Sequence, residues 1–271
     1  MVVTISREPE LELLVRIAHT VESRVAQERM SPHPFRVVAV SAGGTPTEEA
    51  DRVAEAQVLS FLEQEGLNWD LLSEEMGYVR RGGEKVLILD PIDGSSNLLS
   101  GLPFATISLA LGNKSLSDVK VGVVHDLYSG KTYWATKGGG AFQDGVPIKT
   151  RPWRQGRDLF FLNLNRNSTD RLRSLTSKAA RIRSLGCASM EMSLVASGVG
   201  DLYFSEAANE GSNLRITDIA AAQLILTEAG GGFSKGDGSP LEMTLSIDER
   251  TSILAWGSRA LMEEGKHQGY W

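Results

Sequence analysis

The stretch from Val86 to Asn97 constrains the fold of this chain more than any other. Four consecutive apolar residues, Val86 to Leu89, have the pattern of a strand buried on both faces. Two aspartates, Asp90 and Asp93, follow directly at the carboxyl end of that strand, and the chain then turns at Gly94. Carboxylates this close repel each other unless a cation or a proton lies between them. The sequence therefore predicts a sheet with a charged edge.

The residue types after the strand indicate which ions suit this edge. Oxygen ligands alone favour Mg²⁺ or Mn²⁺ over zinc, because no cluster of cysteine or histidine accompanies them. The hydroxyls of Ser95 and Ser96 and the backbone N–H groups up to Asn97 stand at the start of an expected short helix, a natural seat for a phosphate oxygen. The alternative is that an isolated Asp-x-x-Asp-Gly string is only a turn with helix-capping acids.

Three further acidic positions are candidates for the same site. Glu74, in Ser73-Glu74-Glu75, follows an apolar strand expected over 69–72, although adjacent acids there fit a solvated loop equally well. Asp218 begins a helix that is apolar nearly all round, so it either interacts with the helix dipole or lies deep enough to need a cation. Asp51 lies beside the apolar stripe of its helix and is expected to point partly inward.

Two amphipathic helices are expected near the N-terminus. Apolar residues recur at helical spacing over 8–30. The second helix is expected to end near Glu65 and to begin with Thr45 as N-cap, Pro46 at N1 and Glu48 at N3 of a capping box.

The pattern along the chain changes near residue 150. From 68 to 148 most of the periodicity is that of strands, which predicts an antiparallel sheet covered by the two helices. After 150, strands and helices alternate, as in α/β structure. We therefore expect an N-terminal α+β domain over 1–150 that carries most metal ligands and a C-terminal α/β domain over 151–271 that carries Asp218.

Composition and charge narrow the classes of function. The chain has 271 residues, of which 41% are hydrophobic, enough for a well-packed globular core. Its net charge of -6 and the lack of any block of lysine and arginine argue against nucleic acid binding. No stretch approaches the roughly 20 apolar residues of a membrane span, and the N-terminus becomes charged before a signal-peptide core develops. The single cysteine, Cys187, excludes an internal disulfide and fits a cytoplasmic location.

Other hydrolase chemistries fit less well. Haloacid dehalogenase-type phosphatases place two acids two residues apart after a strand, whereas Asp90 and Asp93 are three apart. The string Ser129-Gly130-Lys131-Thr132 resembles the end of a P-loop, but His125 replaces the first glycine and strands follow, so a hairpin turn is expected. No G-x-S-x-G string is present, Cys187 is expected to be a packing residue, and four histidines are expected to be ordinary surface or packing residues: His19, His33, His125 and His267.

Three motifs in order resemble the inositol monophosphatase and fructose-1,6-bisphosphatase superfamily of Mg²⁺-dependent, lithium-sensitive phosphatases. The string from Asp90 to Asn97 is similar to its D-P-[IL]-D-G-[ST]-x-N signature, and Ser73-Glu74-Glu75 to its upstream acidic pair. Thr217-Asp218-Ile219-Ala220-Ala221 is similar to its W-D-x-x-A signature, with threonine in place of tryptophan. The similarity covers almost the whole chain and is closest to the archaeal-type branch, in which one enzyme often accepts both inositol 1-phosphate and fructose 1,6-bisphosphate.

The resemblance implies a fold and an assembly. The fold is a layered α-β-α-β-α arrangement, with an antiparallel sheet and helices in the N-terminal half and a second, mixed sheet in the C-terminal half. Relatives are commonly homodimers, and their partner is a small phosphate ester.

The resemblance also implies roles for individual residues. Two or three Mg²⁺ ions would be held by the side chains of Glu74, Asp90, Asp93 and Asp218 and by the Ile92 carbonyl. Glu74 and Ser95 would act on the attacking water, with Asp51 paired to Ser95, and a loop at Gly43 and Gly44 would fold over the site. Substrate contacts would come from Asp93, Gly94, Ser95, Ser96, Gly186, Cys187, Ala188 and Arg215.

Two other interpretations stay open at this point. A relative that acts on a 3′-phosphorylated adenine nucleotide shares the metal site but needs a pocket for a flat base, and the segment Ser205 to Asn213, longer than expected for the archaeal branch, does not clearly supply one. A non-catalytic relative is the other, but it should have lost one of the five acids Asp51, Glu74, Asp90, Asp93 and Asp218, and all are present.

Overall fold

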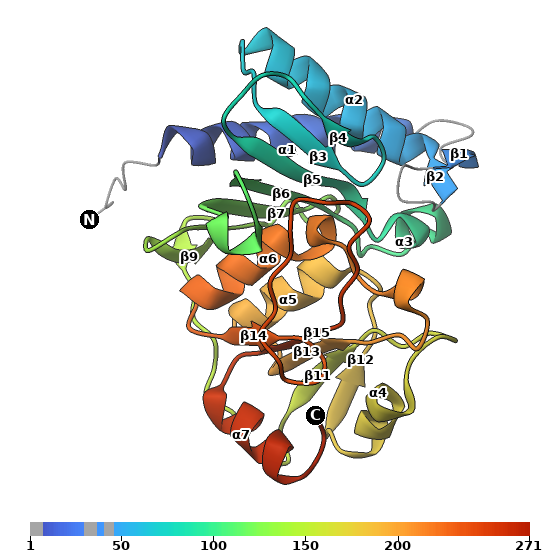
Figure 1. Ribbon diagram of the computed structural model, residues 1–271, viewed down its shortest axis with the longest axis vertical. Helices are drawn as coiled ribbons and strands as arrows, with labels where there is room; N and C mark the ends of the chain where they lie inside the picture. The colour runs from blue at the N-terminus through green and yellow to red at the C-terminus, as the bar shows by residue number, and fades with distance from the viewer. Residues whose placement is uncertain (1–7, 30–36, 41–45) are drawn as a thin grey trace.

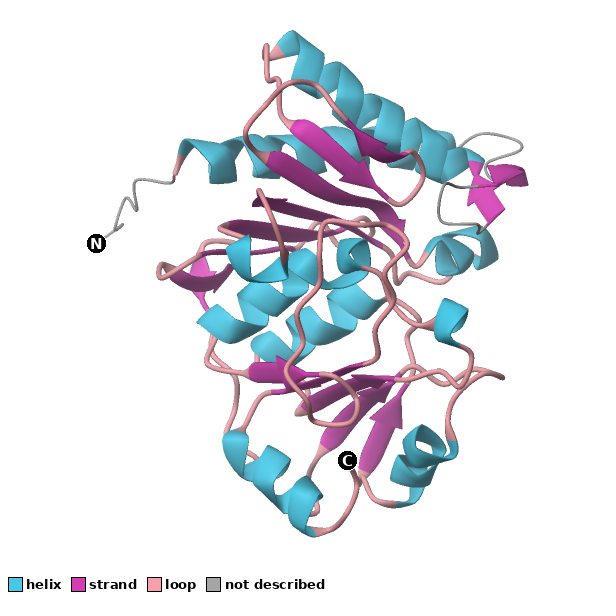
Figure 2. Cartoon of the chain, viewed as in Figure 1, coloured by secondary structure: helices cyan, strands magenta, loops and turns pink. Residues whose placement is uncertain are grey.

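The computed structural model describes residues 8–29, 37–40 and 46–271, so the expected Thr45 cap and the Gly43–Gly44 loop lie outside the described residues. The chain forms five stacked layers in the order helix, sheet, helix, sheet, helix along the long axis of the molecule (Figure 1). Figure 2 shows the middle helices lying between the two sheets. The expected α-β-α-β-α arrangement is confirmed.

Helices α1 (Pro9–Arg29) and α2 (Glu49–Gln64) form the outer layer at the N-terminal end. Their apolar faces pack on one face of an eight-stranded sheet, together with side chains such as Leu87, Leu89 and Val123, in one hydrophobic cluster. Across this sheet the strand order is β10-β9-β8-β7-β6-β5-β3-β4. Along the chain the strands are β3 (Asp70–Ser73), β4 (Gly77–Val79), β5 (Val86–Asp93), β6 (Thr106–Gly112), β7 (Val121–Asp126), β8 (Thr132–Thr136), β9 (Gly140–Gln143) and β10 (Val146–Pro147).

Helix α2 begins later than the sequence predicts. The residues Pro46–Glu48 form strand β2, which pairs antiparallel with β1 (Val37–Val40). The predicted helix start with Pro46 at N1 and Glu48 at N3 is therefore wrong. Pairing with β1 satisfies the backbone groups of these residues in an extended conformation, and this long-range contact outweighs the local capping pattern.

The sequence analysis predicted an antiparallel first sheet. The sheet is mostly antiparallel, but one pair of strands is parallel. Strand β4 forms a hairpin with β3 and occupies its outer side, so β5 pairs with β3 on the other side and runs parallel to it. In this register Ser73 lies opposite Leu89. Glu74, which follows β3, therefore lies beside Asp90; β5 continues beyond the expected end at Leu89 and includes both Asp90 and Asp93. The expected hairpin turn between β7 and β8 is confirmed, with Gly130 at φ 71°.

Helices α5 (Ala188–Ala196) and α6 (Ile216–Glu228) form the middle layer. The expected apolar helix around Ala221 is confirmed, and it is buried along most of its length. It packs so closely on β7 that a Cβ on Gly122 would lie 2.8 Å from the carbonyl oxygen of Ala221. Glycine at this position allows the helix to lie directly on the sheet.

The second sheet has five strands and is mixed, as expected. Parallel pairs join β11 to β12 and to β13, and antiparallel pairs join β15 to β13 and to β14. Helices α4 (Asp170–Ser174) and α7 (Arg259–His267) cover its outer face. Across this sheet the strand order is β12-β11-β13-β15-β14. Along the chain the strands are β11 (Leu159–Leu162), β12 (Arg181–Arg183), β13 (Leu202–Ser205), β14 (Gly232–Ser234) and β15 (Ile253–Trp256).

The two sheets use different parts of the chain but share a core. The first sheet ends at Pro147 and the second begins at Leu159. One hydrophobic cluster nevertheless includes Ile88 of the first sheet, Ala221 of α6 and Ile253 of the second sheet. We propose that the expected division near residue 150 separates two units that pack as one body.

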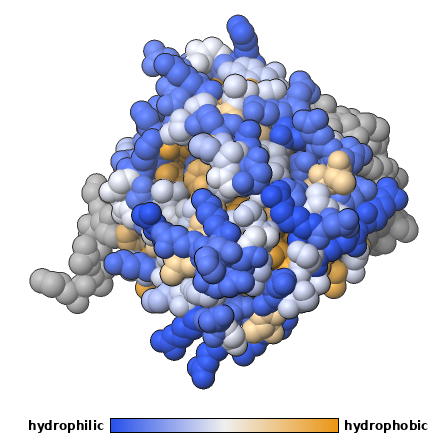
Figure 3. Space-filling view, turned by 60° about the horizontal axis from the view of Figure 1, so that its bottom comes forward, coloured by the Kyte–Doolittle hydropathy of each residue, from blue (hydrophilic) through white to orange (hydrophobic). Residues whose placement is uncertain are grey.

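The surface is mostly polar on the face that Figure 3 presents, where hydrophobic residues form only small patches. None of the helices in the described part of the chain is long and apolar enough to span a bilayer.

Candidate active site

A pocket of about 240 Å³ opens at the edge of the first sheet where β3 and β5 end. Among the residues that the structure describes, every one expected at the site lines this pocket except Asp51. Four lining residues had no role in the sequence analysis: Asn163, Glu191, Tyr203 and Leu214. Asn163 directly follows β11, a strand-end position that could have identified it, whereas Tyr203 lies within a buried strand and carries no such signal.

A larger hollow of about 600 Å³ lies elsewhere, beside Arg151 and Arg181. Its only acidic lining residue is Asp201, which forms an ion pair with Arg151. This hollow offers no group of carboxylates, so the smaller pocket is the better candidate for catalysis.

Three carboxylates converge in the smaller pocket. Glu74, Asp90 and Asp218 each offer an oxygen within 4.8 Å of the others. The parallel pairing of β3 and β5 brings the first two together, and the backbone N–H of Glu74 donates to the Leu89 carbonyl at 3.2 Å. Asp218 comes from the later half of the chain, in the first turn of α6.

The surroundings of these carboxylates oppose their ionisation. Burial, followed by the charge of Asp218, raises the pKa of Glu74 to about 8. Burial, followed by the charges of Glu74 and Asp93, raises the pKa of Asp90 well above its ordinary value. Bringing several acids together in a buried place costs free energy unless a cation compensates their charge. A set made only of carboxylate oxygens fits Mg²⁺.

Asp93 occupies a different position from these three. Its Oδ1 accepts from the Ala188 N–H at 3.2 Å, and its Oδ2 accepts from the Ser189 N–H and hydroxyl, both at 2.6 Å. Burial raises the pKa of Asp93 to about 6, although the hydrogen bonds from Ser189 act against that rise. Asp93 thus holds the N-terminus of α5 while it lines the pocket, and its oxygens keep lone pairs for another ligand.

Asp218 fits both of the alternatives that the sequence left open, because it caps its helix and also lies buried beside other acids. Its Oδ2 accepts from the backbone N–H of Arg215 at 2.9 Å in a capping box, so it stabilises the start of α6. It also belongs to the carboxylate cluster. Arg215 is only 4% exposed, and its guanidinium forms an ion pair with Glu74, so this residue lies against the acidic group as well as lining the pocket.

The short helix α3 (Ser95–Ser100) begins beside the acids, as expected. Its N-cap, Gly94, has φ 86°, and a Cβ there would lie 2.6 Å from the Phe104 carbonyl oxygen. Only glycine fits this turn. Because the first N–H groups of a helix have no partner within it, the backbone at Gly94 and Ser95 is available to an anion in the pocket.

Asn97 connects the two halves of the site, a role that the sequence analysis did not assign. Its Nδ2 donates to the Phe104 carbonyl at 2.8 Å and to the Leu185 carbonyl at 2.7 Å. The neighbouring Cys187 is buried, and its thiol donates to the Asp93 carbonyl at 3.3 Å. Burial raises the pKa of this thiol well above its ordinary value, which suits the expected packing role and opposes a nucleophilic one.

Asp51 lies behind the pocket rather than on its wall. It is only 4% exposed on α2, which confirms the expected inward orientation. One helical turn later, Glu55 accepts a hydrogen bond from the Ser73 hydroxyl, and burial raises the pKa of Glu55 to about 7. Glu55 is a second buried acid behind the site that the sequence analysis did not single out.

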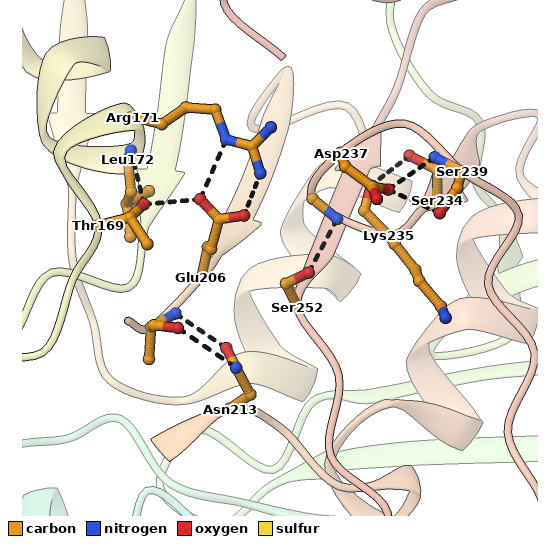
Figure 4. Close-up of polar contacts among 12 residues, drawn as sticks. Thr169, Arg171, Leu172, Glu206, Asn213, Ser234, Lys235, Asp237, Ser239 and Ser252 are labelled. Carbon is orange, nitrogen blue, oxygen red and sulfur yellow. Dashed lines mark hydrogen bonds and ion pairs between the residues drawn. The ribbon is translucent and has the colours of Figure 1, made fainter. Parts of the chain in front are cut away.

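The segment from Ser205 to Asn213 is folded back on itself near the pocket. Asn213 Oδ1 accepts from the Ala207 N–H at 2.8 Å, and the Glu206 carboxylate accepts from Thr169 Oγ1 at 2.6 Å and from Arg171 Nε at 3.0 Å (Figure 4). A single carboxylate therefore ties this segment to the start of α4. None of the described residues 205–213 is among those that line the pocket, although Tyr203 and Leu214 on either side of the segment are.

Comparison with known sequences supports the motifs. The profile described as the inositol monophosphatase family matches residues 7–264. A protein of Methanothermobacter thermautotrophicus named fructose-1,6-bisphosphatase/inositol-1-monophosphatase is 33% identical over 266 residues, covering 92% of each chain. A bifunctional NADP phosphatase/NAD kinase of Methanococcus maripaludis is 30% identical over 268 residues, and the match covers 90% of this chain but 46% of that protein.

Comparison with solved structures supports the fold. The crystal structure of an inositol monophosphatase–fructose 1,6-bisphosphatase superposes with a TM-score of 0.83 at 26% identity, covering 95% of this chain and 98% of the other. An inositol monophosphatase of Thermotoga maritima, at 24% identity and a TM-score of 0.76, has the same fold. The chain therefore belongs to the inositol monophosphatase family and is a phosphatase that hydrolyses phosphoric monoesters.

Proposed function

We propose that this phosphatase uses Mg²⁺ to hydrolyse a small sugar or inositol phosphate, with fructose 1,6-bisphosphate and inositol 1-phosphate as its first candidate substrates. The convergence of the Glu74, Asp90 and Asp218 carboxylates in one pocket carries this proposal. The names of two archaeal relatives combine the two activities, one at 33% and one at 29% identity.

The proposed metal set consists of the three converging carboxylates, with Asp93 and the Ile92 carbonyl as further ligands. When bound, two or three Mg²⁺ ions would neutralise phosphate oxygens, acidify a water and stabilise the leaving oxygen. Mn²⁺ has the same ligand preference.

The remaining groups of the site act on the phosphate and the water. The N–H groups of Gly94 and Ser95 donate to phosphate oxygens at the start of α3. Glu74 and the Ser95 hydroxyl orient the attacking water, the Glu74 carboxylate takes its proton, and Asp51 orients the Ser95 hydroxyl. Because the Cys187 thiol is buried and its pKa is raised, we propose direct attack by water without a covalent intermediate on the protein.

The later half of the chain is proposed to recognise the rest of the substrate. Ser96 and the turn from Gly186 to Ala188 line the pocket, and Arg215 lines it beside Glu74. These groups would face the sugar or inositol ring. Since Asn97 fixes the position of the Leu185 carbonyl, the ring-binding turn is held at a set distance from the phosphate site.

One assay tests the proposed substrate class. Purified protein with Mg²⁺ is offered fructose 1,6-bisphosphate, inositol 1-phosphate and adenosine 3′,5′-bisphosphate side by side, and kcat/KM is compared. We expect the highest value with one of the first two, loss of activity with a chelator, and inhibition by Li⁺. A kcat/KM that is highest for the adenosine nucleotide would overturn the proposal.

A nucleotide substrate is the second candidate, because a specific observation favours it. Two relatives, at 30% and 32% identity, are named bifunctional NADP phosphatase/NAD kinase, although this chain covers less than half the length of each. NADP therefore belongs in the same assay. Selective release of phosphate from NADP would favour this candidate over the sugar phosphates.

We further propose that the protein works as a homodimer in the cytoplasm. The dimer rests on the family resemblance, and the location rests on a single cysteine that the structure leaves as a free thiol. Light scattering coupled to size-exclusion chromatography measures the mass in solution directly, and a mass near 29.4 kDa would contradict the dimer.

A further inference from the structure

A second group of potential metal ligands lies outside the pocket, on the face of the first sheet that α1 covers. His19 and Glu22 project from neighbouring turns of α1, and His125 comes from β7. Their ligand atoms lie within 4.8 Å of one another. Unlike the active-site acids, this group contains two imidazoles.

Two of the three separations within this group, both measured from Glu22, match those around a tetrahedral ion. Glu22 Oε2 lies 3.2 Å from His125 Nε2 and 3.4 Å from His19 Nδ1. An ion with bonds of about 2.0–2.1 Å in tetrahedral geometry keeps its ligand atoms roughly 3.3–3.4 Å apart. The atoms thus need little movement to accept one.

The His125 ring is fixed in an orientation that presents Nε2 to the group. The residue is 0% exposed, and its Nδ1 lies 2.8 Å from the Thr132 hydroxyl. Metal-binding histidines are commonly oriented in this way through the nitrogen that does not bind the ion. Burial lowers the pKa of His125, so the ring favours the neutral form that has a free lone pair.

The buried Nε2 has no hydrogen-bond partner among the described residues. Glu22 Oε2 is close enough at 3.2 Å, but the angle between them does not make a hydrogen bond. The same oxygen, Glu22 Oε2, makes a hydrogen bond with His19 Nδ1 at 3.4 Å, so two imidazoles from different elements approach one carboxylate oxygen. His19 is 53% exposed and leaves a route from solvent to that centre.

We propose that His19 Nδ1, Glu22 Oε2 and His125 Nε2 bind one zinc-type transition metal ion, with water as the fourth ligand. Two histidines and one glutamate form a known zinc ligand set, and nitrogen ligands select such metals against Mg²⁺. The ion would join α1 to β7 and stabilise the layer of helices on the first sheet. The proposal is independent of the phosphatase reaction, because none of the three residues lines the active-site pocket.

Cobalt titration tests this site separately from the active site. Chelator-treated protein is dialysed into excess Mg²⁺, which occupies the oxygen-only cluster, and is then titrated with Co²⁺ while visible absorption is recorded. Tetrahedral Co²⁺ with nitrogen ligands absorbs far more strongly than six-coordinate Co²⁺ with oxygen ligands alone. We compare the wild type, His19→Ala, Glu22→Gln and, as a matched control, His267→Ala, which removes an exposed histidine from α7.

We expect the wild type and His267→Ala to develop the strong spectrum with one equivalent of Co²⁺, and His19→Ala and Glu22→Gln to need at least about tenfold more metal. Zinc at about 100 times its Kd should also raise the Tm of the wild type and the control by several degrees, but not that of His19→Ala. Identical titrations for the wild type and His19→Ala would overturn the proposal. Phosphatase activity in Mg²⁺ should be equal in all four proteins.

Discussion

Asp93 caps a helix that belongs to the other half of the chain: its Oδ2 accepts hydrogen bonds from both the N–H and the hydroxyl of Ser189, each at 2.6 Å. This contact joins the end of β5 to the start of α5. The N–H and hydroxyl of Ser189 thus hold the Asp93 carboxylate, a proposed metal ligand, and also attach the middle layer of helices to the first sheet.

Ser189→Ala should weaken this connection. Removing a hydroxyl that donates to a carboxylate is expected to lower the free energy of unfolding by about 1.5–3 kcal/mol, measured by urea denaturation. The matched control is Ser193→Ala on the same helix, whose hydroxyl donates to the Ser189 carbonyl and does not touch Asp93. An equal loss in both variants would mean that the contact with Asp93 contributes nothing specific.

Asp90→Asn and Asp218→Asn should separate activity from stability. Each substitution removes a charge from the carboxylate cluster, so Mg²⁺-dependent kcat/KM is expected to fall more than about 100-fold. In a chelator, the Tm of Asp90→Asn should equal or exceed that of the wild type, because the substitution relieves repulsion with Glu74.

Glu75→Gln is the control for this pair, since Glu75 adjoins Glu74 in sequence but does not line the pocket. It should keep most of the activity. Near-normal turnover in Asp90→Asn or Asp218→Asn would remove these residues from the metal site.

Ser95→Ala should lower kcat by roughly 100-fold with a modest change in KM, if the hydroxyl orients the attacking water. Ser95→Thr should retain activity, because threonine keeps the hydroxyl and restricts its rotamer. Ser100→Ala is the control on the same helix, where the hydroxyl donates only to the Ser96 carbonyl. Steady-state kinetics with the preferred substrate measure all three, and an unchanged kcat in Ser95→Ala would exclude the role.

The metal-free protein should lose stability as the pH rises from 6.5 to 8.5. Burial raises the pKa of Glu55 to about 7 and the pKa values of Glu74 and Glu191 to about 8. The folded state binds protons that the unfolded chain has already released, so the stability from these acids is lost as the pH passes through the raised values. The buried His125, whose pKa is lowered, adds stability as the pH rises through its unfolded value, so it opposes this trend only at the lower end of the range.

Thermal unfolding in a chelator, with and without added Mg²⁺, measures this dependence. We expect the Tm to fall by several degrees without Mg²⁺, and the fall to become smaller with Mg²⁺, because the cation replaces the protons. Glu191→Gln should remove part of the slope. A Tm that rises over this range in the chelator would show that the acids are already ionised.

Local patterns identified the elements that the core requires. The apolar run before Asp90 forms the first part of β5, and the apolar run around Ala221 forms α6. An element that is buried on all sides needs consecutive apolar residues, and such a run is visible in the sequence. The start of α2 was predicted wrongly, since the capping pattern at Pro46 is local and the pairing of β2 with β1 is not.

The sequence by itself determined which residues are candidates for the chemistry, because acids that directly follow apolar runs or begin an apolar helix are conspicuous whatever the fold does with them. Only the tertiary structure decided how they meet: the parallel pairing of β3 and β5 brings Glu74 to Asp90, and the packing of α6 brings Asp218 to both. The role of Asn97, the place of Glu191 in the wall of the pocket and the approach of His125 to α1 also depend on contacts between segments distant in the chain. Such contacts are set by burial and by hydrogen bonds that form only when the layers close, and no local pattern encodes them.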